Sequence, residues 1–160
     1  MLYSKKMLQV VKTALQMFEL VEDDSQVEVL WLAAITGLRA VGHVLVKTDK
    51  LNHPELANII DPWWSELKAN KQAEGNRIFF DFIEVERNDT IKEFKIKYDK
   101  QPQCIGVIQQ CNSQTTEHIF ELDGLLYIPM QDGLYAGEDV RDLIADAIKW
   151  WELQFAYMDL

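Results

Sequence analysis

The segment from Gln26 to Lys47 constrains the fold more than any other part of the chain. Almost every residue inside it is apolar, and the few polar ones do not interrupt a helical pattern. A helix that is apolar around most of its circumference has to be covered by other elements. The sequence therefore predicts a central helix here, with Gly37 and Gly42 allowing neighbouring helices to approach closely.

Amphipathic patterns predict further helices on both sides of this central one. In each of them apolar residues recur at spacings of three and four, and the predicted ranges are 4–21, 55–71, 76–96 and 138–157. Ser25, with Glu28 three residues later, resembles a capping box at the start of the central helix. Pro62 is expected to kink or divide the helix over 55–71.

After Tyr98 the pattern changes from helix to strand. Short segments rich in Ile, Val and Phe predict strands at 104–110, 119–122 and 125–128. The pair Asp123-Gly124 is a strong hairpin signal between the last two. We therefore expect a predominantly all-α fold, built as a four- to five-helix up-and-down bundle with a small β-hairpin insertion near residues 104–128. Residues 1–160 are expected to form a single domain, with the β excursion over about 100–130.

Charge and composition limit the classes of function. The formal net charge is -10, from 26 acidic and 16 basic residues, so a broad DNA-binding surface is not expected, whereas a small pocket for a phosphate or an RNA loop is compatible. The start of the chain has no signal-peptide pattern. The longest apolar run, around 29–35, is far shorter than the about 20 residues that a membrane span needs. We expect a cytoplasmic protein without a membrane partner.

Metal and cofactor motifs are weak. Cys104, Cys111 and His118 recur every seven residues, and with His53 or Asp123 they would make four zinc ligands. The closely paired cysteines of structural zinc sites are missing, so we predict no metal and no cofactor. The sequence also has no Gly-rich phosphate loop, nucleophile elbow or H-E-x-x-H motif.

An arginine interrupts an apolar face of the predicted helix over 76–96. By spacing, five residues share that face: Phe80, Ile83, Arg87, Ile91 and Phe94. A guanidinium there is costly unless it is paired or wetted. Arg87 is therefore either a structural ion pair that ties helices together or a planar donor fork in a groove, suited to phosphate or carboxylate. Beside it, Glu84, Asn88 and Lys92 form a second row, in which Glu84 can reach Arg87 or Asn88.

The central helix carries a comparable polar stripe. Its members recur at spacings of three and four: Thr36, Arg39, His43, Lys47 and Lys50. In a functional interpretation, His43 is a candidate base beside Arg39. In the alternative interpretation, the stripe is the solvated strip of a buried helix.

The segment from Glu86 to Phe94 resembles the signature helix of the HEPN superfamily, a group of small all-α domains found in many prokaryotic toxin–antitoxin and defence systems. The family motif is an arginine, usually followed by a polar residue such as asparagine, then four to six residues and a histidine. Arg87 and Asn88 match this motif, whereas Lys92 stands where the histidine is expected. The resemblance implies a homodimeric helical domain, whose active relatives are metal-independent ribonucleases. Lysine is a poor base near neutral pH but can stabilise phosphate charge.

Three hypotheses follow for the function. The first is a HEPN-like, non-catalytic module that binds RNA or a partner protein, through residues drawn from both stripes: Arg39, His43, Lys47, Glu84, Arg87, Asn88 and Lys92. The second is a metal-independent endoribonuclease in which His43 replaces the missing base beside Arg39 and Arg87, which requires the two stripes to face each other. The third is a structural or interaction protein, in which both stripes are satisfied internally. In that case the tryptophan pairs at 63–64 and 150–151 each place one ring in the core and one at an interface.

Overall fold

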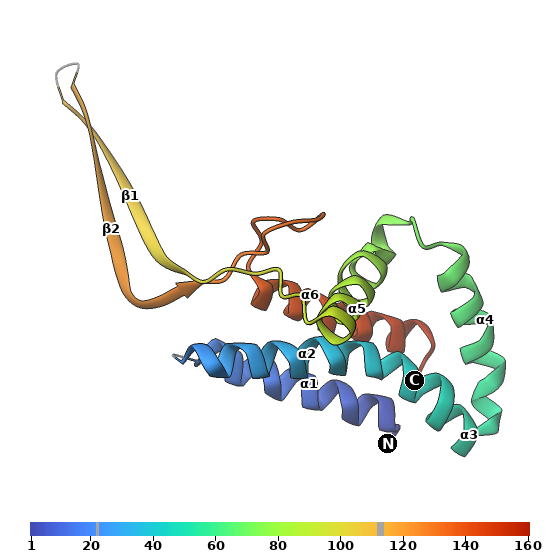
Figure 1. Cartoon of the computed structure of the whole chain (residues 1–160). Coiled ribbons are helices and arrows are strands. Elements are labelled where there is room, and N and C mark those ends of the chain that lie inside the picture. Colours follow the sequence, from blue (N-terminus) through green and yellow to red (C-terminus); the bar gives the residue numbers. More distant parts are fainter. Residues whose placement is uncertain (22, 112–113) are drawn as a thin grey trace. The chain divides into compact units, whose positions relative to one another are not determined.

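The computed structural model describes residues 1–21, 23–111 and 114–160. Within these residues the protein is mostly helical, with one two-stranded antiparallel hairpin, which confirms the predicted combination. The chain divides into two compact units, a helical unit of residues 1–96 and 141–160 and a hairpin unit of residues 97–140. In chain order, with π-helical (η1, η4) and 3-10 (η2, η3) segments included, the elements are α1 (Tyr3–Glu19), α2 (Asp24–Val44), η1 (Leu45–Asp49), α3 (Lys50–Asn52), η2 (Pro54–Leu56), α4 (Ala57–Ala69), η3 (Glu74–Asn76), η4 (Ile78–Glu84), α5 (Val85–Glu93), β1 (Gln101–Cys111), β2 (Gln114–Tyr127) and α6 (Val140–Tyr157) (Figure 1).

Helices α1 and α2 run alongside each other (Figure 1). The buried residues of α1 lie on one face at helical spacing, namely Ser4, Leu8, Val11, Ala14 and Phe18. A Cβ atom added at Gly37 would lie 2.6 Å from Cγ2 of Val11. This contact confirms that Gly37 permits a close approach to the central helix.

A buried carboxylate caps the first turn of α1. The backbone N–H groups of Tyr3 and Ser4 donate to the two carboxylate oxygens of Asp49, at 2.8 and 2.9 Å. Asp49 is fully buried and lies in η1, which continues α2. The first N–H groups of a helix have no partner within the helix, so Asp49 satisfies them and its negative charge lies at the favourable end of the helix dipole.

The central helix is capped by a different residue from the one predicted. It begins at Asp24, and the Asp23 side chain accepts a hydrogen bond from the backbone of Ser25 at 2.9 Å. The capping-box prediction for Ser25 is therefore wrong, because an aspartate two positions earlier takes the cap position. The helix buries residues such as Val27, Trp31 and Leu38, whereas a strip that includes Val29 and Leu32 is exposed, at 65% and 38%.

One helical run among the described residues is long and apolar enough to cross a membrane by length and composition alone. It extends over Ser25–Asn52, and 44% of its most apolar window is buried inside the protein. The sequence-based expectation of no span considered only consecutive apolar residues, whereas the helix as a whole contains few charges. The central helix of a water-soluble protein meets the same criterion.

Helix α4 continues through its proline. Of the two predicted outcomes, a kink or a division, the division does not occur, because Pro62 lies inside the continuous helix Ala57–Ala69. The helix buries Ile60, Trp63 and Leu67 on one side. These spacings of three and four place the apolar residues on one face and leave Pro62 exposed.

A π-helical segment changes which face of the 78–93 region is buried. Residues of η4 follow a wider turn than an α-helix, so the predicted 3.6-residue spacing does not hold across it. The buried residues are Phe79, Phe82, Ile83, Glu86 and Thr90. The predicted apolar face is therefore wrong in its second half, where Ile91 and Phe94 are 46% and 72% exposed. Arg87 lies beside the buried face and is half-buried.

Aromatic rings from α4, η4 and α6 form much of the core of the helical unit. Phe79 stacks on Trp150 with centroids 5.0 Å apart and meets Trp151 edge-on at 5.7 Å. Trp150 is only 5% exposed and donates to the backbone oxygen of Gly75 at 2.8 Å. The prediction that one ring of this pair stays at the surface is therefore wrong, whereas Trp64 is half-buried beside the buried Trp63.

In the hairpin unit, β1 pairs with β2 in an antiparallel register from Gln101↔Tyr127 to Cys111↔Gln114. The predicted turn at Asp123-Gly124 is wrong, because both residues lie within β2. They fall where the register shifts between Pro102 and Cys104, at an irregularity in the pairing of the strands. The residues that connect the two strands, 112 and 113, lie outside the described ones.

Candidate functional site

The two predicted polar stripes meet at one pocket in the helical unit. The pocket has a volume of about 370 Å³. One wall comes from α2 and the other from the end of η4 and the start of α5, and the lining residues are Thr36, Arg39, Ala40, His43, Glu84, Arg87 and Asn88. The condition that the second hypothesis imposed, that the stripes face each other, is thus met within one chain.

Helical spacing explains why α2 presents these residues together. Thr36, Arg39 and His43 recur every three or four positions and therefore share a face, while Leu38 and Val41 on another face are fully buried. The facing wall repeats the pattern, since residues 87 and 88 both lie about one turn after residue 84.

Arg39 is held firmly in its wall. An Nη atom lies 3.2 Å from a carboxylate oxygen of Glu84, and the guanidinium carbon lies 5.5 Å from the centroid of the Phe79 ring. Its Nη1 atom is buried without a hydrogen-bond partner among the described residues. The ion pair and the cation–π contact both orient the guanidinium. Phe79 was not predicted as part of the site, because its place under Arg39 depends on the π-helical turn, which no spacing pattern signals.

Arg87 is held loosely by comparison. Its Nη1 atom donates to Oδ1 of Asn88 at 2.9 Å, and that neutral amide is the partner the structure gives it among the described residues. The interpretation of Arg87 as a sealed structural ion pair is therefore wrong, since Glu84 pairs with Arg39 instead. A half-buried guanidinium without a carboxylate keeps donors available for an anion in the pocket.

His43 lines the pocket from an exposed position, one turn after Arg39. An exposed imidazole can reach a ligand that enters the pocket, and histidine is the residue type that most often serves as a general base. Thr36, also exposed, adds a hydroxyl at the other end of the same face.

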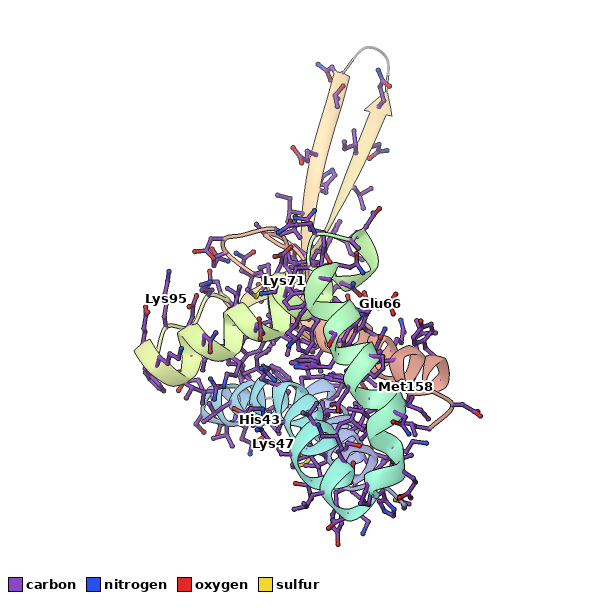
Figure 2. The ribbon with its side chains drawn as sticks, turned by 90° about the vertical axis from the view of Figure 1, so that its right-hand side faces the viewer. His43, Lys47, Glu66, Lys71, Lys95 and Met158 are labelled. Carbon is purple, nitrogen blue, oxygen red and sulfur yellow. The ribbon has the colours of Figure 1, made fainter. Side chains whose placement is uncertain are left out.

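Two predicted site residues, Lys47 and Lys92, do not line the pocket. Helix α2 and the 78–93 region run antiparallel to each other. Trp31 donates a hydrogen bond to Thr90, whereas Arg39, which comes later in α2, pairs with Glu84, which comes earlier in the facing region. Lys92 therefore lies beyond the pocket on the Trp31 side. Lys47 lies beyond it on the other side, one turn past His43 (Figure 2).

The pocket is locally basic in an acidic protein. Two arginines and one glutamate line it, so the formal charge of its lining is +1 with His43 neutral, whereas the whole chain carries -10. Two guanidinium groups from different helices can bind one phosphate or carboxylate through paired hydrogen bonds. The local sign therefore favours a small anionic group.

Metal ligands do not gather in the described part of the chain. No three His, Cys, Asp or Glu residues there are placed to hold an ion. Cys104 is exposed, and the side chains of Cys111 and Asp123 lie outside the described ones.

No protein-family model, no curated protein and no solved structure matches this chain. The chemistry of the pocket is therefore inferred from its own residues.

Proposed function

We propose that this protein is a HEPN-like binding module whose pocket holds a phosphate of single-stranded RNA. The observation that carries the proposal is the convergence of Arg39 and Arg87, from two helices, on one pocket in which Arg87 has no carboxylate partner among the described residues. In the proposed arrangement the helices form an up-and-down bundle. The resemblance of the Arg87-Asn88 helix to the HEPN signature supports the same ligand class.

A single strand fits the charge distribution better than a duplex does. The chain carries -10 overall, so a long phosphate backbone would be repelled outside the basic pocket. A single-stranded loop can present one phosphate with its sugar to a pocket of about 370 Å³. The proposal is therefore a small footprint that contacts one or two nucleotides.

Binding is proposed ahead of catalysis because of Lys92. The residue at the histidine position of the family motif lies outside the pocket, so the motif helix supplies an arginine and an amide but no base. We propose that the protein acts in the cytoplasm as a homodimeric regulatory component, of the kind found in toxin–antitoxin or defence systems.

A second candidate function is metal-independent cleavage of RNA. The observation that favours it is that His43 lines the same pocket as Arg87. An imidazole there can take the proton from a ribose 2′-hydroxyl while Arg39 and Arg87 stabilise the charge on the attacked phosphate. The 2′-oxygen then bonds to phosphorus as the bond from phosphorus to the 5′-oxygen breaks, which gives a 2′,3′-cyclic phosphate, and the leaving 5′-oxygen takes a proton from the protonated imidazole or from water. In this candidate, His43 takes the role that the family motif gives to the histidine of the helix containing Arg87.

The test is binding of a short fluorescein-labelled single-stranded RNA in EDTA, followed by fluorescence anisotropy. Arg87→Ala removes charge-assisted hydrogen bonds and is expected to weaken binding about 10- to 100-fold. Lys47→Ala, which removes the same charge outside the pocket, is the matched control and is expected to change affinity less than about twofold.

The same samples separate the two candidates when the RNA is examined on a denaturing gel. Intact RNA supports the binding module, whereas cleavage that is lost in both Arg87→Ala and His43→Ala supports the ribonuclease. RNA binding that is absent, or equally reduced by Arg87→Ala and Lys47→Ala, contradicts both.

A further inference from the structure

The hairpin unit presents long exposed stretches of both strands. All side chains of residues 104–110 and 114–121 are exposed, and the sheet has two strands only. Several of these exposed residues are large and apolar: Ile105, Val107, Ile108, Ile119 and Phe120. A two-stranded hairpin is marginally stable in water and gains stability from a further strand or a packed face.

The register sorts the exposed residues into two unlike faces. Directly paired residues share a face, so Ile105 lies with Phe120 and Val107 lies with His118. On that face the His118 ring stacks on Phe120, with centroids 6.3 Å apart and an interplanar angle of 28°. The other face carries the acids, since Cys104 pairs with Glu121. The face with Ile105, Val107 and Phe120 thus carries no carboxylate among its paired residues.

The two edges of the hairpin also differ. β1 has no charged residue from Gln101 to Cys111, whereas β2 carries Glu117 and Glu121. Natural edge strands that avoid pairing usually carry charges, prolines or bulges. Pro102 and the register shift beside it interrupt only the beginning of β1, so the run from Cys104 to Cys111 is an unprotected edge.

We propose that β1 pairs antiparallel with β1 of a second copy of this chain, which makes a four-stranded sheet in the order β2-β1-β1-β2. A second copy suits this edge because β1 against β1 brings no charges together, and the side-chain amide of Gln110 can both donate and accept. Pairing β2 with β2 would instead bring glutamates of the two copies together, for example Glu117 of one copy opposite Glu121 of the other in a register centred on Ile119. Pairing β1 with β2 would leave free edges and would not close, whereas β1 with β1 closes on a two-fold axis.

This surface is independent of the proposed RNA pocket and gives the protein a specific self-association site. The two apolar faces, each with Ile105, Val107 and Phe120, become one continuous face across the joined sheet. Hydrogen bonds between the two β1 backbones supply the affinity.

The test compares lysine substitutions at two residues that are paired across the hairpin, one on each strand. The dimer dissociation constant of the full chain is measured by sedimentation velocity over a dilution series. Val107 and His118 are paired across the hairpin and are both exposed. Val107→Lys places a charge in the middle of the β1 edge and is expected to raise the dimer dissociation constant at least about tenfold. His118→Lys adds a lysine on the same face but on β2, and is expected to change that constant less than about twofold.

A second measurement keeps the proposal testable if a lysine disturbs the hairpin. The second measurement uses a Cys104→Ser/Cys111→Ser background. In it, Val107→Cys lies near the middle of the run from 104 to 111, where two-fold pairing places a residue close to its own copy in the partner chain. Oxidation is expected to give a disulfide-linked dimer with Val107→Cys and not with His118→Cys. The proposal is overturned if the wild-type protein stays monomeric. It is also overturned if substitutions at Val107 and at His118 change dimer formation equally. RNA binding in the same samples is a separate readout, because loss of the dimer alone does not bear on the pocket.

Discussion

The two walls of the pocket carry one arginine each, but the walls hold these arginines in opposite ways. On the α2 wall, Arg39 is paired with Glu84 at 3.2 Å and rests against the Phe79 ring, with only 21% of its side chain exposed. On the α5 wall, Arg87 has the neutral Asn88 as its partner. One guanidinium is thus part of the packed interior, and the other is oriented by a weaker contact.

This difference suggests a division of roles within one anion site. A charge that is already paired contributes shape and orientation, because a ligand must compete with the existing carboxylate for it. A charge without a carboxylate contributes more of its hydrogen-bonding capacity to the ligand. We therefore expect substitutions on the α2 wall to change stability and those on the α5 wall to change affinity.

The largest expected effect concerns the ring beneath Arg39. Phe79 is fully buried among aromatic rings, and Phe79→Ala is expected to lower the free energy of unfolding by about 3–5 kcal/mol. Urea denaturation followed by tryptophan fluorescence and far-UV circular dichroism measures this. Phe80→Ala, at the half-buried neighbouring position, is the control and should cost clearly less. Equal losses of unfolding free energy for Phe79→Ala and Phe80→Ala would contradict the comparison. The ring beneath Arg39 would then give the α2 wall no special support.

A smaller effect separates the two arginines directly. Arg39→Ala removes a part-buried ion pair, a cation–π contact and the packing of the side-chain stem, and is expected to lower the free energy of unfolding by about 1–2 kcal/mol. Arg87→Ala removes one hydrogen bond at a half-buried site and is expected to cost less than about 1 kcal/mol. The same denaturation experiment tests both. A larger loss for Arg87→Ala would restore the structural interpretation of that residue.

Glu84→Gln sharpens the comparison further, through affinity. This change removes the negative charge of the pocket while keeping the shape of the side chain, so Arg39 becomes available to the ligand. RNA affinity, measured by anisotropy, is expected to rise about two- to fivefold. Glu66→Gln, an exposed carboxylate that lines a different pocket, is the control for the general effect of net charge. Weaker binding by Glu84→Gln than by Glu66→Gln would show that the Arg39–Glu84 pair has to stay intact.

The smallest expected effect is at Lys92, one turn beyond Asn88. The side chain is exposed and outside the pocket lining, so Lys92→Ala is expected to change RNA affinity less than about twofold at physiological salt. The anisotropy assay used for Arg87→Ala measures it. A loss as large as that of Arg87→Ala would extend the site along α5, beyond the wall described.

The helical elements could be predicted from apolar periodicity, because each has to bury one face. Local chemistry was harder to predict. Asp23 caps α2 in place of Ser25, since either residue type can accept from the first turn. The tertiary cap that Asp49 provides for α1 joins residues 45 and 46 positions apart, so no local pattern reveals it. Asp123-Gly124 also has ordinary turn chemistry, but the pairing of the strands places it inside β2.

The identity of the site residues could be predicted better than their contacts with one another. Spacing alone brought Thr36, Arg39 and His43 to one face. The π-helical turn of η4 shifts the residues after it relative to the buried face, so Arg87 lies at the edge of that face and not in its middle. The partner of Glu84 depends on how α2 crosses the 78–93 region, and that geometry is not encoded in the spacing within either helix.

The most direct test of the central claim is a two-dimensional NMR titration of the full chain with a short single-stranded RNA. The account predicts that backbone amide signals of Arg39, His43, Arg87 and Asn88 shift with a common dissociation constant, while those of Lys47 and Lys92 shift little. Arg87→Ala should raise the dissociation constant reported at the remaining three positions by about 10- to 100-fold. Shifts that concentrate elsewhere, or that persist unchanged in Arg87→Ala, would contradict the claim that the two arginines form one anion site.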